Sequence, residues 1–253
     1  MLVGKSSLLR GLIVALALVS FQCSEEKEEA SGELQSTLRL SSNAAMQGKL
    51  TIQTSSARLT ELKYTGTPPS QDVETYIQTL NGTEEAMPLT GPDADPITIS
   101  AIKSRYEPFI ATLTFHSDDY AVKFDAANLP DLTDYMLNGK PALTMLGTFD
   151  NRGKKTKVLV AIADLTTLNI AAKQYDSPEI EVGDVNKAEI FFNPMVWFEG
   201  ITTEAIESAA RVTYNNEEVV FIHRQFNSTL HKRIQDNIED LPAATFFKFI
   251  KLE

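Results

Sequence analysis

Cysteine is almost absent from this sequence, because Cys23 is the only one among 253 residues. One cysteine cannot form an intramolecular disulfide, so the fold cannot depend on a disulfide framework. Exported proteins seldom keep a reactive thiol that has no use. The position of Cys23 is therefore informative.

Histidine and glycine are also scarce. The three histidines, His116, His223 and His231, include no pair at the close spacing that is typical of zinc ligands. We expect each to be a surface residue or a structural residue with satisfied hydrogen bonds, and we expect no metal site. The twelve glycines are spread thinly and form no phosphate-binding loop, so the sequence predicts no nucleotide cofactor.

Catalytic motifs are missing as well. No Gly-x-Ser-x-Gly sequence is present, and the one thiol lies at the N-terminus. Two pairs of neighbouring carboxylates could serve acid–base chemistry or bind calcium: Asp93 with Asp95, and Asp118 with Asp119. Calcium takes roughly six to eight oxygen ligands, typically from a dense acidic loop. We interpret both pairs as solvated turn residues and expect no catalytic residue, no cofactor and no enzymatic activity.

Positive charge is under-represented, with 23 basic against 34 acidic residues and a net charge of -11. Residues 1–22 contain two cations and no acid, so their removal would bring the net charge to -13. An acidic chain repels phosphate backbones, and no basic stretch interleaved with aromatics is present. The sequence therefore predicts no nucleic-acid partner.

The first 22 residues have the pattern of a signal peptide. Lys5 and Arg10 precede an apolar run over residues 12–19, and the first acidic residue is Glu25. The apolar run is shorter than the roughly 20 residues that a membrane-spanning helix needs. We expect a cleaved leader over 1–22 rather than a permanent transmembrane anchor.

Cys23 follows this leader directly, and residues 24–29 are mostly acidic. The junction resembles the bacterial lipoprotein signal, in which the cysteine is thioether-linked to diacylglycerol and becomes the mature N-terminus. Gln22 and Ser20 depart from that pattern, which has a small residue before the cysteine and usually leucine three before it. The resemblance implies a lipidated Cys23 and a membrane partner; the alternative is an incidental thiol in a cleaved leader.

The chain after the leader divides into a tether and a body. Residues 23–33 comprise the cysteine and an acidic stretch without large apolar side chains, which we expect to be a solvated tether. Residues 34–253 contain no internal repeat and no second linker, and they are numerous enough for one well-buried domain. We predict a single domain there.

Alternation of apolar and polar residues dominates this body. It is clear in residues 50–53, 97–101 and 110–116, where one side of a strand would pack and the other would face water. Residues 158–163 and 219–222 are apolar on both faces, as expected of central strands. The pattern predicts an all-β fold, mainly an antiparallel β-sandwich.

Local irregularities fit the same fold. In residues 57–64, Leu59 and Leu62 are out of phase, which a one-residue bulge would repair. Residues 150–153 have the composition of a hairpin turn, with glycine available for positive φ. The segment 73–80 has helical spacing but strand composition, and its strand neighbours favour a strand.

Two segments are expected to be helical. Residues 131–137 follow a proline and precede Asn138-Gly139, which predicts a short helical turn. A longer helix should begin with Asn227 or Ser228 as its N-cap. Its apolar stripe, which we expect to pack on a sheet, comprises Leu230, Ile234, Ile238 and Leu241.

The order of these features along the chain resembles that of a loosely defined group of uncharacterised Bacteroidota lipoproteins. The segments that carry the resemblance are 50–52, 59–64, 146–149, 193–200 and 227–241. The acidic run after Cys23 also looks like the surface-export signal of Bacteroidota lipoproteins. The group has no established activity, so the resemblance implies a fold and an address at the cell envelope, on the outer membrane, and leaves surface exposure open.

The corner at residues 193–200 contains Trp197, the only tryptophan, next to Phe198. If these aromatics are exposed, they could stack on a sugar, with Glu199 or Asn193 accepting hydrogen bonds from its hydroxyl groups. If they are buried, they close the end of the sandwich, and this interpretation is favoured. The corner is the candidate ligand platform.

Two functions remain open. The first is a non-enzymatic binding or adhesion module, anchored by lipid, with a glycan or protein ligand. The second is a structural or accessory component of a cell-envelope complex. Exposure of Trp197 and Phe198 separates them, because exposed aromatics favour ligand binding and buried aromatics favour a scaffold.

Overall fold

The structure is a computed structural model in which the described residues are 31–65, 76–78, 86–90, 97–102, 104–105, 110–116, 132, 141–163, 165, 167–171, 179–180, 183, 185–240 and 244–251. Cys23, the carboxylate pairs at 93–95 and 118–119, and the helix predicted over 131–137 lie outside these residues, apart from the buried Leu132.

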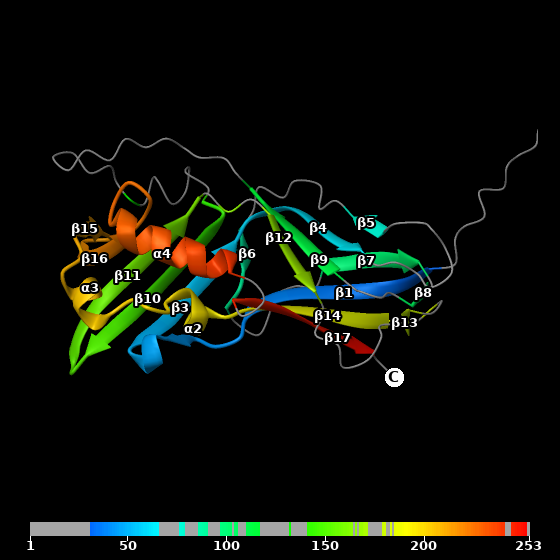
Figure 1. Ribbon diagram of the computed structural model, residues 1–253, viewed down its shortest axis with the longest axis horizontal. Helices are drawn as coiled ribbons and strands as arrows, with labels where there is room; N and C mark the ends of the chain where they lie inside the picture. The colour runs from blue at the N-terminus through cyan, green and yellow to red at the C-terminus, as the bar shows by residue number, and fades with distance from the viewer. Residues whose placement is uncertain are drawn as a thin grey trace, which may run out of the picture.

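Strands make up most of the described chain (Figure 1). They are β1 (Ser31–Leu40), β2 (Ala44–Ala45), β3 (Leu50–Ala57), β4 (Leu59–Thr65), β5 (Tyr76–Gln78), β6 (Met87–Pro88), β7 (Ile97–Ile102), β8 (Ser104–Arg105), β9 (Ile110–Phe115), β10 (Leu143–Asn151), β11 (Lys154–Ile162), β12 (Thr167–Ala171), β13 (Glu179–Ile180), β14 (Val185–Phe192), β15 (Arg211–Tyr214), β16 (Glu217–Ile222) and β17 (Thr245–Lys251). The helical elements are η1 (Met46–Gly48), α2 (Pro194–Trp197), α3 (Thr203–Glu207) and α4 (Ser228–Glu239).

The strands form two packed regions. In one, the sheets β17-β14-β1-β7 and β12-β9-β4-β5 face each other, and the Tyr64 hydroxyl of β4 donates a 2.9 Å hydrogen bond to Ser36 of β1. In the other, a seven-stranded sheet, β15-β16-β11-β10-β3-β2 with β6 on β3, is covered by α4 (Figure 1). The predicted all-β, mainly antiparallel fold with a helix near the C-terminus is confirmed.

Two details differ from the expectation. The pairs β1–β14 and β11–β16 are parallel, and β17 follows α4, so the helix is not the last element. Parallel pairing joins strands that are distant in sequence, and local alternation carries no information about it. The assignment of residues 34–253 to one domain stays a prediction.

Burial follows the predicted alternation. In β9, Ala111, Leu113 and Phe115 are buried on one face. In β11, successive residues belong to two different core clusters, with Val160 on one side of the sheet and Leu159 on the other. The strand predicted at 73–80 is also present, as β5.

The structure contains the predicted bulge and the predicted hairpin turn. The register between β4 and β9 shifts between Leu59 and Glu61, which confirms the predicted bulge. The β10–β11 hairpin turns at Arg152 and Gly153, both with positive φ, and the Gly153 amide donates to the carboxylate of Asp150. This is the left-handed two-residue turn that glycine favours.

Asn227 is the N-cap residue of α4, as the sequence predicted, but its side chain does not cap the helix. Helix α4 begins at Ser228, but the Asn227 side chain makes no capping hydrogen bond and the residue has a φ of 56°. Its side-chain amide instead bonds the backbone N–H and carbonyl of Ala210 and the carbonyl of Phe221. Asn227 therefore ties the start of α4 to β16 and to the segment before β15.

Three of the four residues of the predicted apolar stripe lie on the packed side of α4, whereas Leu241 lies outside the described residues. Ile234 and Ile238 are fully buried, Leu230 is half-buried, and His231 lies on the same buried face. The helix contacts β11 and β16. Among the described helices, none has the length and hydrophobicity that crossing a membrane would require.

Candidate binding site

The corner at 193–200 is a single helical turn that follows β14. The Asn193 side-chain oxygen accepts a 3.2 Å hydrogen bond from the Met195 amide, and Pro194 occupies the first helical position. Both features favour the start of a helix. The cap gives a hydrogen-bond acceptor to a backbone N–H of the first turn, and proline has no backbone N–H that would need one. Asn193 therefore caps this helical turn, and its predicted part in a ligand platform stays a prediction.

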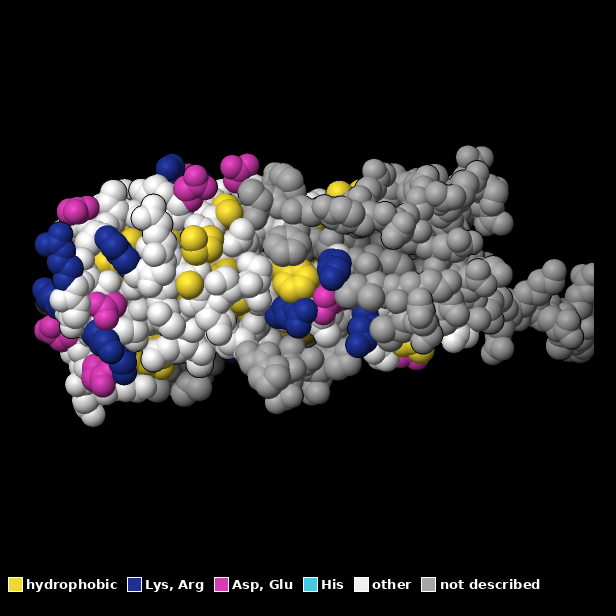
Figure 2. All heavy atoms as spheres, turned by 90° about the horizontal axis from the view of Figure 1, so that it is seen from below, with side chains coloured by type: hydrophobic (Ala, Val, Ile, Leu, Met, Phe, Trp, Pro, Cys, Tyr) yellow, Lys and Arg dark blue, Asp and Glu magenta, His cyan; other side chains and the backbone are white. Residues whose placement is uncertain are grey.

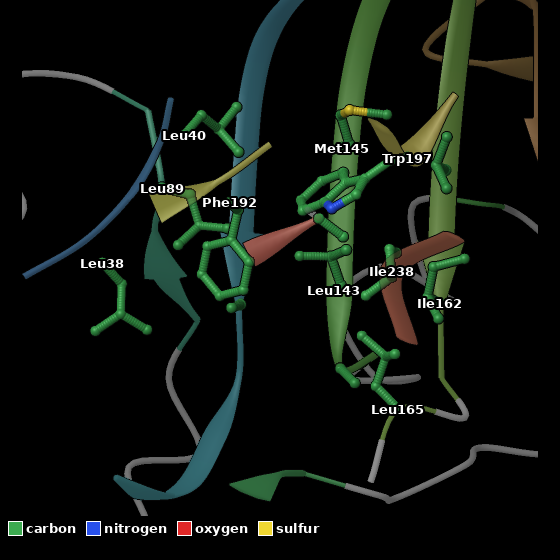
Figure 3. Packing of buried hydrophobic residues seen from close by; sticks show 14 of the residues in the cluster. Leu38, Leu40, Leu89, Leu143, Met145, Ile162, Leu165, Phe192, Trp197 and Ile238 are labelled. Atoms are coloured by element: carbon green, nitrogen blue, oxygen red, sulfur yellow. The ribbon is translucent and has the colours of Figure 1, made fainter. Parts of the chain in front are cut away.

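Trp197 and Phe198 are buried, with 0% and 2% of their surfaces exposed. The Trp197 ring meets Phe192 edge-to-face at 5.9 Å, and Figure 3 shows it among core side chains that include Leu143 and Met145. The one-turn helix directs Pro194 and Trp197 to the same, inner side. The exposed aromatic platform is therefore corrected, since neither ring can stack on a ligand.

Side chains of α4 hold this corner in place. The Asn237 side-chain N–H donates to the carbonyls of Trp197 and Glu199, both at 2.9 Å, and Arg233 donates to the Glu199 carbonyl. Gly200 has a φ of 75°, and a Cβ there would collide with the Arg233 guanidinium. The backbone of the corner is thus fixed, while the Glu199 side chain is exposed.

A cavity of about 440 Å³ opens beside the corner. We call it the corner pocket. Its walls come from the η1 turn, from the end of α2 and the residues after it, and from the start of α3. The lining residues are Met46, Gln47, Lys49, Met195, Phe198, Glu199, Gly200, Ile201, Thr202, Thr203 and Glu204.

One wall of the corner pocket has an unusual backbone. Met46, Gln47 and Gly48 have φ values of 50°, 58° and 86°, so three consecutive residues are left-handed. For non-glycine residues this conformation costs about 1–3 kcal/mol each, and such strain is concentrated at functional sites. The next residue, Lys49, donates a 2.7 Å hydrogen bond to the Thr203 hydroxyl, which joins this wall to α3.

The pocket combines apolar and acidic groups. Met195 is 43% exposed and is the one large hydrophobic side chain classed as exposed among the described residues. The pKa of Glu204 is lowered, mainly because its carboxylate accepts a hydrogen bond from its own backbone amide. A hydrogen bond from the Thr202 hydroxyl and the nearby charge of Lys49 lower this pKa further. In the described part of the chain, no ion pair neutralises Glu199 or Glu204.

Charges of both signs occur on the described part of the face in Figure 2. On the described part of the face in Figure 2, cations and carboxylates alternate and hydrophobic side chains are scattered singly. Lys157, for example, forms an ion pair with Glu217 across the β11–β16 pair.

The structure brings two of the three histidines together. His223 and His231 are both buried, with ring centroids 6.1 Å apart, and His223 stacks on Phe221 at 5.5 Å. The His223 ring accepts a hydrogen bond from the Gln225 amide. The sequence did not reveal this pair, because the turn at 223–226 and the first turn of α4 create it. Among the described residues, no three metal-ligating side chains come together.

Burial is the main cause that lowers the pKa of His223 and of His231 to about 4. The neighbouring His231 lowers the pKa of His223 further, and the positive charge of Arg224 lowers the pKa of His231 further. The native protein therefore binds fewer protons than the unfolded chain between pH 6.5 and 4, and stability should fall as the pH falls through this window. Between pH 7 and pH 5 we expect a loss on the order of 3 kcal/mol for the pair. Urea unfolding at the two pH values measures it. In a protein with His223→Gln and His231→Gln the loss should be much smaller, and an equal loss would show that other groups are responsible.

Comparisons with known proteins identify no family for this chain. No protein-family model matches this chain, and no curated protein matches it. One solved structure with some likeness is a "putative cell adhesion protein" from Bacteroides eggerthii DSM 20697, at 11% identity and a TM-score of 0.28. The match covers 88% of this chain and 56% of that one, so this chain spans little more than half of that protein's length. A likeness at this level says nothing about ligand or activity.

Proposed function

We propose that this chain is a lipid-anchored, non-enzymatic binding module of the cell envelope whose ligand is a protein segment that enters the corner pocket. The observation that carries the proposal is the pocket itself. It combines an exposed methionine with two carboxylates that form no ion pair with any described residue, and one of its walls is a strained left-handed turn.

The chemistry of the pocket favours a protein over a glycan. Stacking on a sugar ring would need an exposed aromatic face, and the aromatic residues of this corner are buried. Met195 and Met46 are flexible and polarizable side chains, which suit contact with another protein surface. The acidic rim at Glu199 and Glu204 would favour a partner with basic groups.

The orientation of the chain fits an anchor at one end and a ligand at the other. Ser31 begins β1 eight residues after Cys23, so the lipid would lie within about 28 Å of the start of β1. In Figure 1, β1 runs from that end toward the half of the molecule that contains η1, α2 and α3. A lipidated Cys23 would therefore display the corner pocket away from the membrane, at the outer membrane in our proposal.

Substitution of Met195 tests the pocket. The purified lipidated protein is used as bait against envelope and extracellular protein fractions, and the retained partner is quantified. We expect Met195→Glu to weaken retention at least about tenfold, which corresponds to 1.4 kcal/mol, because a charge would replace the apolar contact. Thr213→Glu on β15, an exposed position outside the pocket, is the matched control and should bind normally. Equal binding by the Met195 variant, or no partner for the unmodified protein, would refute the proposal.

The burial of Trp197 and Phe198 favours the second candidate, an accessory component of an envelope complex. Both candidates could use the same pocket, and they differ in the source of the partner. A photo-crosslinking amino acid at position 195 separates them. A crosslinked product from a culture of the producing cells alone indicates an envelope complex, whereas a product that requires an added external protein indicates adhesion.

A further inference from the structure

Strands β1 and β14 lie side by side and parallel over eight paired positions, from Glu33 opposite Val185 to Leu40 opposite Phe192. Both strands run toward the corner pocket. At their C-terminal ends each continues into a different pocket wall, β1 into η1 and β14 into α2 and α3. The N-terminal end of β1 lies at the opposite end of the molecule (Figure 1).

This arrangement decides how a pulling force would act. Tension between the N-terminus and the α2 wall of the corner pocket would pull β1 by its N-terminal end and β14 by its C-terminal end. Because the strands are parallel, these are opposite ends of the ladder, so all its hydrogen bonds would be loaded in shear at once. Resistance to force is governed by the unfolding rate, and a ladder that must break in one step unfolds slowly.

Pulling by the two termini would act differently. Strand β17 is antiparallel to β14, and its last described residue, Lys251, pairs with Asn186 near the start of β14. The C-terminus therefore leaves from the same end of the sheet as the N-terminus. Force applied there would peel β17 from β14 one pair at a time.

Side chains reinforce the β1–β14 pair on both faces. The inner face is closed to water by buried residues that include Leu34, Leu38 and Ile190. On the outer face the Arg39 guanidinium lies 2.6 Å from the Glu189 carboxylate and 4.8 Å from the centre of the Phe191 ring. Hydrogen bonds shielded in this way exchange poorly with water and are harder to break.

We propose that the parallel β1–β14 pair carries tension from the anchored N-terminus to a ligand held against the α2 wall of the corner pocket. This inference rests on the proposed function, because an anchor and a held ligand generate the load. The strands themselves form the direct path between the two points of attachment.

Single-molecule force spectroscopy on the chain from residue 23, with Cys23→Ser, tests the proposal. One handle is attached at the N-terminus and the other either at position 195, through a click-reactive amino acid, or at the C-terminus. We expect a rupture force several-fold higher for the pocket attachment. Equal forces, or a lower force at position 195, would overturn the proposal.

A disulfide staple gives a second measurement on the same path. Thr37 and Glu189 are paired positions of β1 and β14, so Thr37→Cys with Glu189→Cys should raise the rupture force in the pocket geometry when oxidised. The control staple, Thr112→Cys with Asn169→Cys, joins β9 to β12 off the path and should leave that force unchanged. An oxidised β1–β14 staple without effect would also overturn the proposal. Neither measurement needs a ligand, so a failure to find a partner in the retention assay would refute the proposed function without altering this result.

Discussion

Trp197→Ala should lower the free energy of unfolding by about 3–5 kcal/mol. The indole is fully buried, packs edge-to-face on Phe192, and fills the space between the end of β14 and helix α4. Alanine would leave a cavity there that the fixed backbone of the corner cannot close. A loss of this size is a large part of the roughly 5–15 kcal/mol that stabilises a typical protein.

Denaturant unfolding followed by circular dichroism measures this loss, since the substitution removes the tryptophan fluorescence. Met195→Ala is the matched control, because it lies in the same helical turn but is exposed. It should change stability by no more than about 0.5 kcal/mol. If the tryptophan variant lost less than the methionine variant, Trp197 could not be the plug of this corner.

Cys23→Ser should release the protein from membranes and abolish labelling with a fatty-acid analogue. Each buried acyl methylene contributes about 0.8 kcal/mol, so two or three chains hold a soluble body firmly at a bilayer. Fractionation of cells into membrane and soluble proteins measures the effect, with Ser24→Ala as the control. Retention of the Cys23 variant in the membrane fraction would reverse this interpretation.

Local features of the fold could be predicted because they depend on neighbouring residues. The alternation in 110–116 predicted the buried face of β9, and the phase shift between Leu59 and Leu62 predicted a bulge at the place where the register shifts. The turn at residues 150–153 was predicted from its composition alone. In each case the side-chain pattern and the backbone geometry are set within a few residues.

Features that depend on distant residues could not be predicted. Leu40 and Phe192 pair across about 150 positions of the sequence, and alternation does not specify which strand lies beside which. The corner pocket likewise forms because Met46 and Met195, which are distant in the sequence, line the same cavity. His223 and His231 came together only because a tight turn reverses the chain before α4.

The burial of Trp197 and Phe198 agrees with the interpretation that the sequence favoured, whereas a ligand site at this corner stays a prediction. Tryptophan is compatible with a core or a surface position, so Trp197 attracted attention to the corner without revealing its orientation. The Asn193-Pro194 start of a helix was a usable signal. It places positions 194 and 197 on one side of a single turn and Met195 on another, and the structure has this arrangement.

Mass spectrometry of the intact protein, extracted from membranes, shows whether this binding module is anchored by lipid. We expect a mature chain that begins at Cys23 and carries the added mass of a diacylglyceryl group. A chain that still contains residues 1–22, or one that begins at an unmodified Cys23, would contradict it. Either result would remove the anchor from which the orientation of the corner pocket follows.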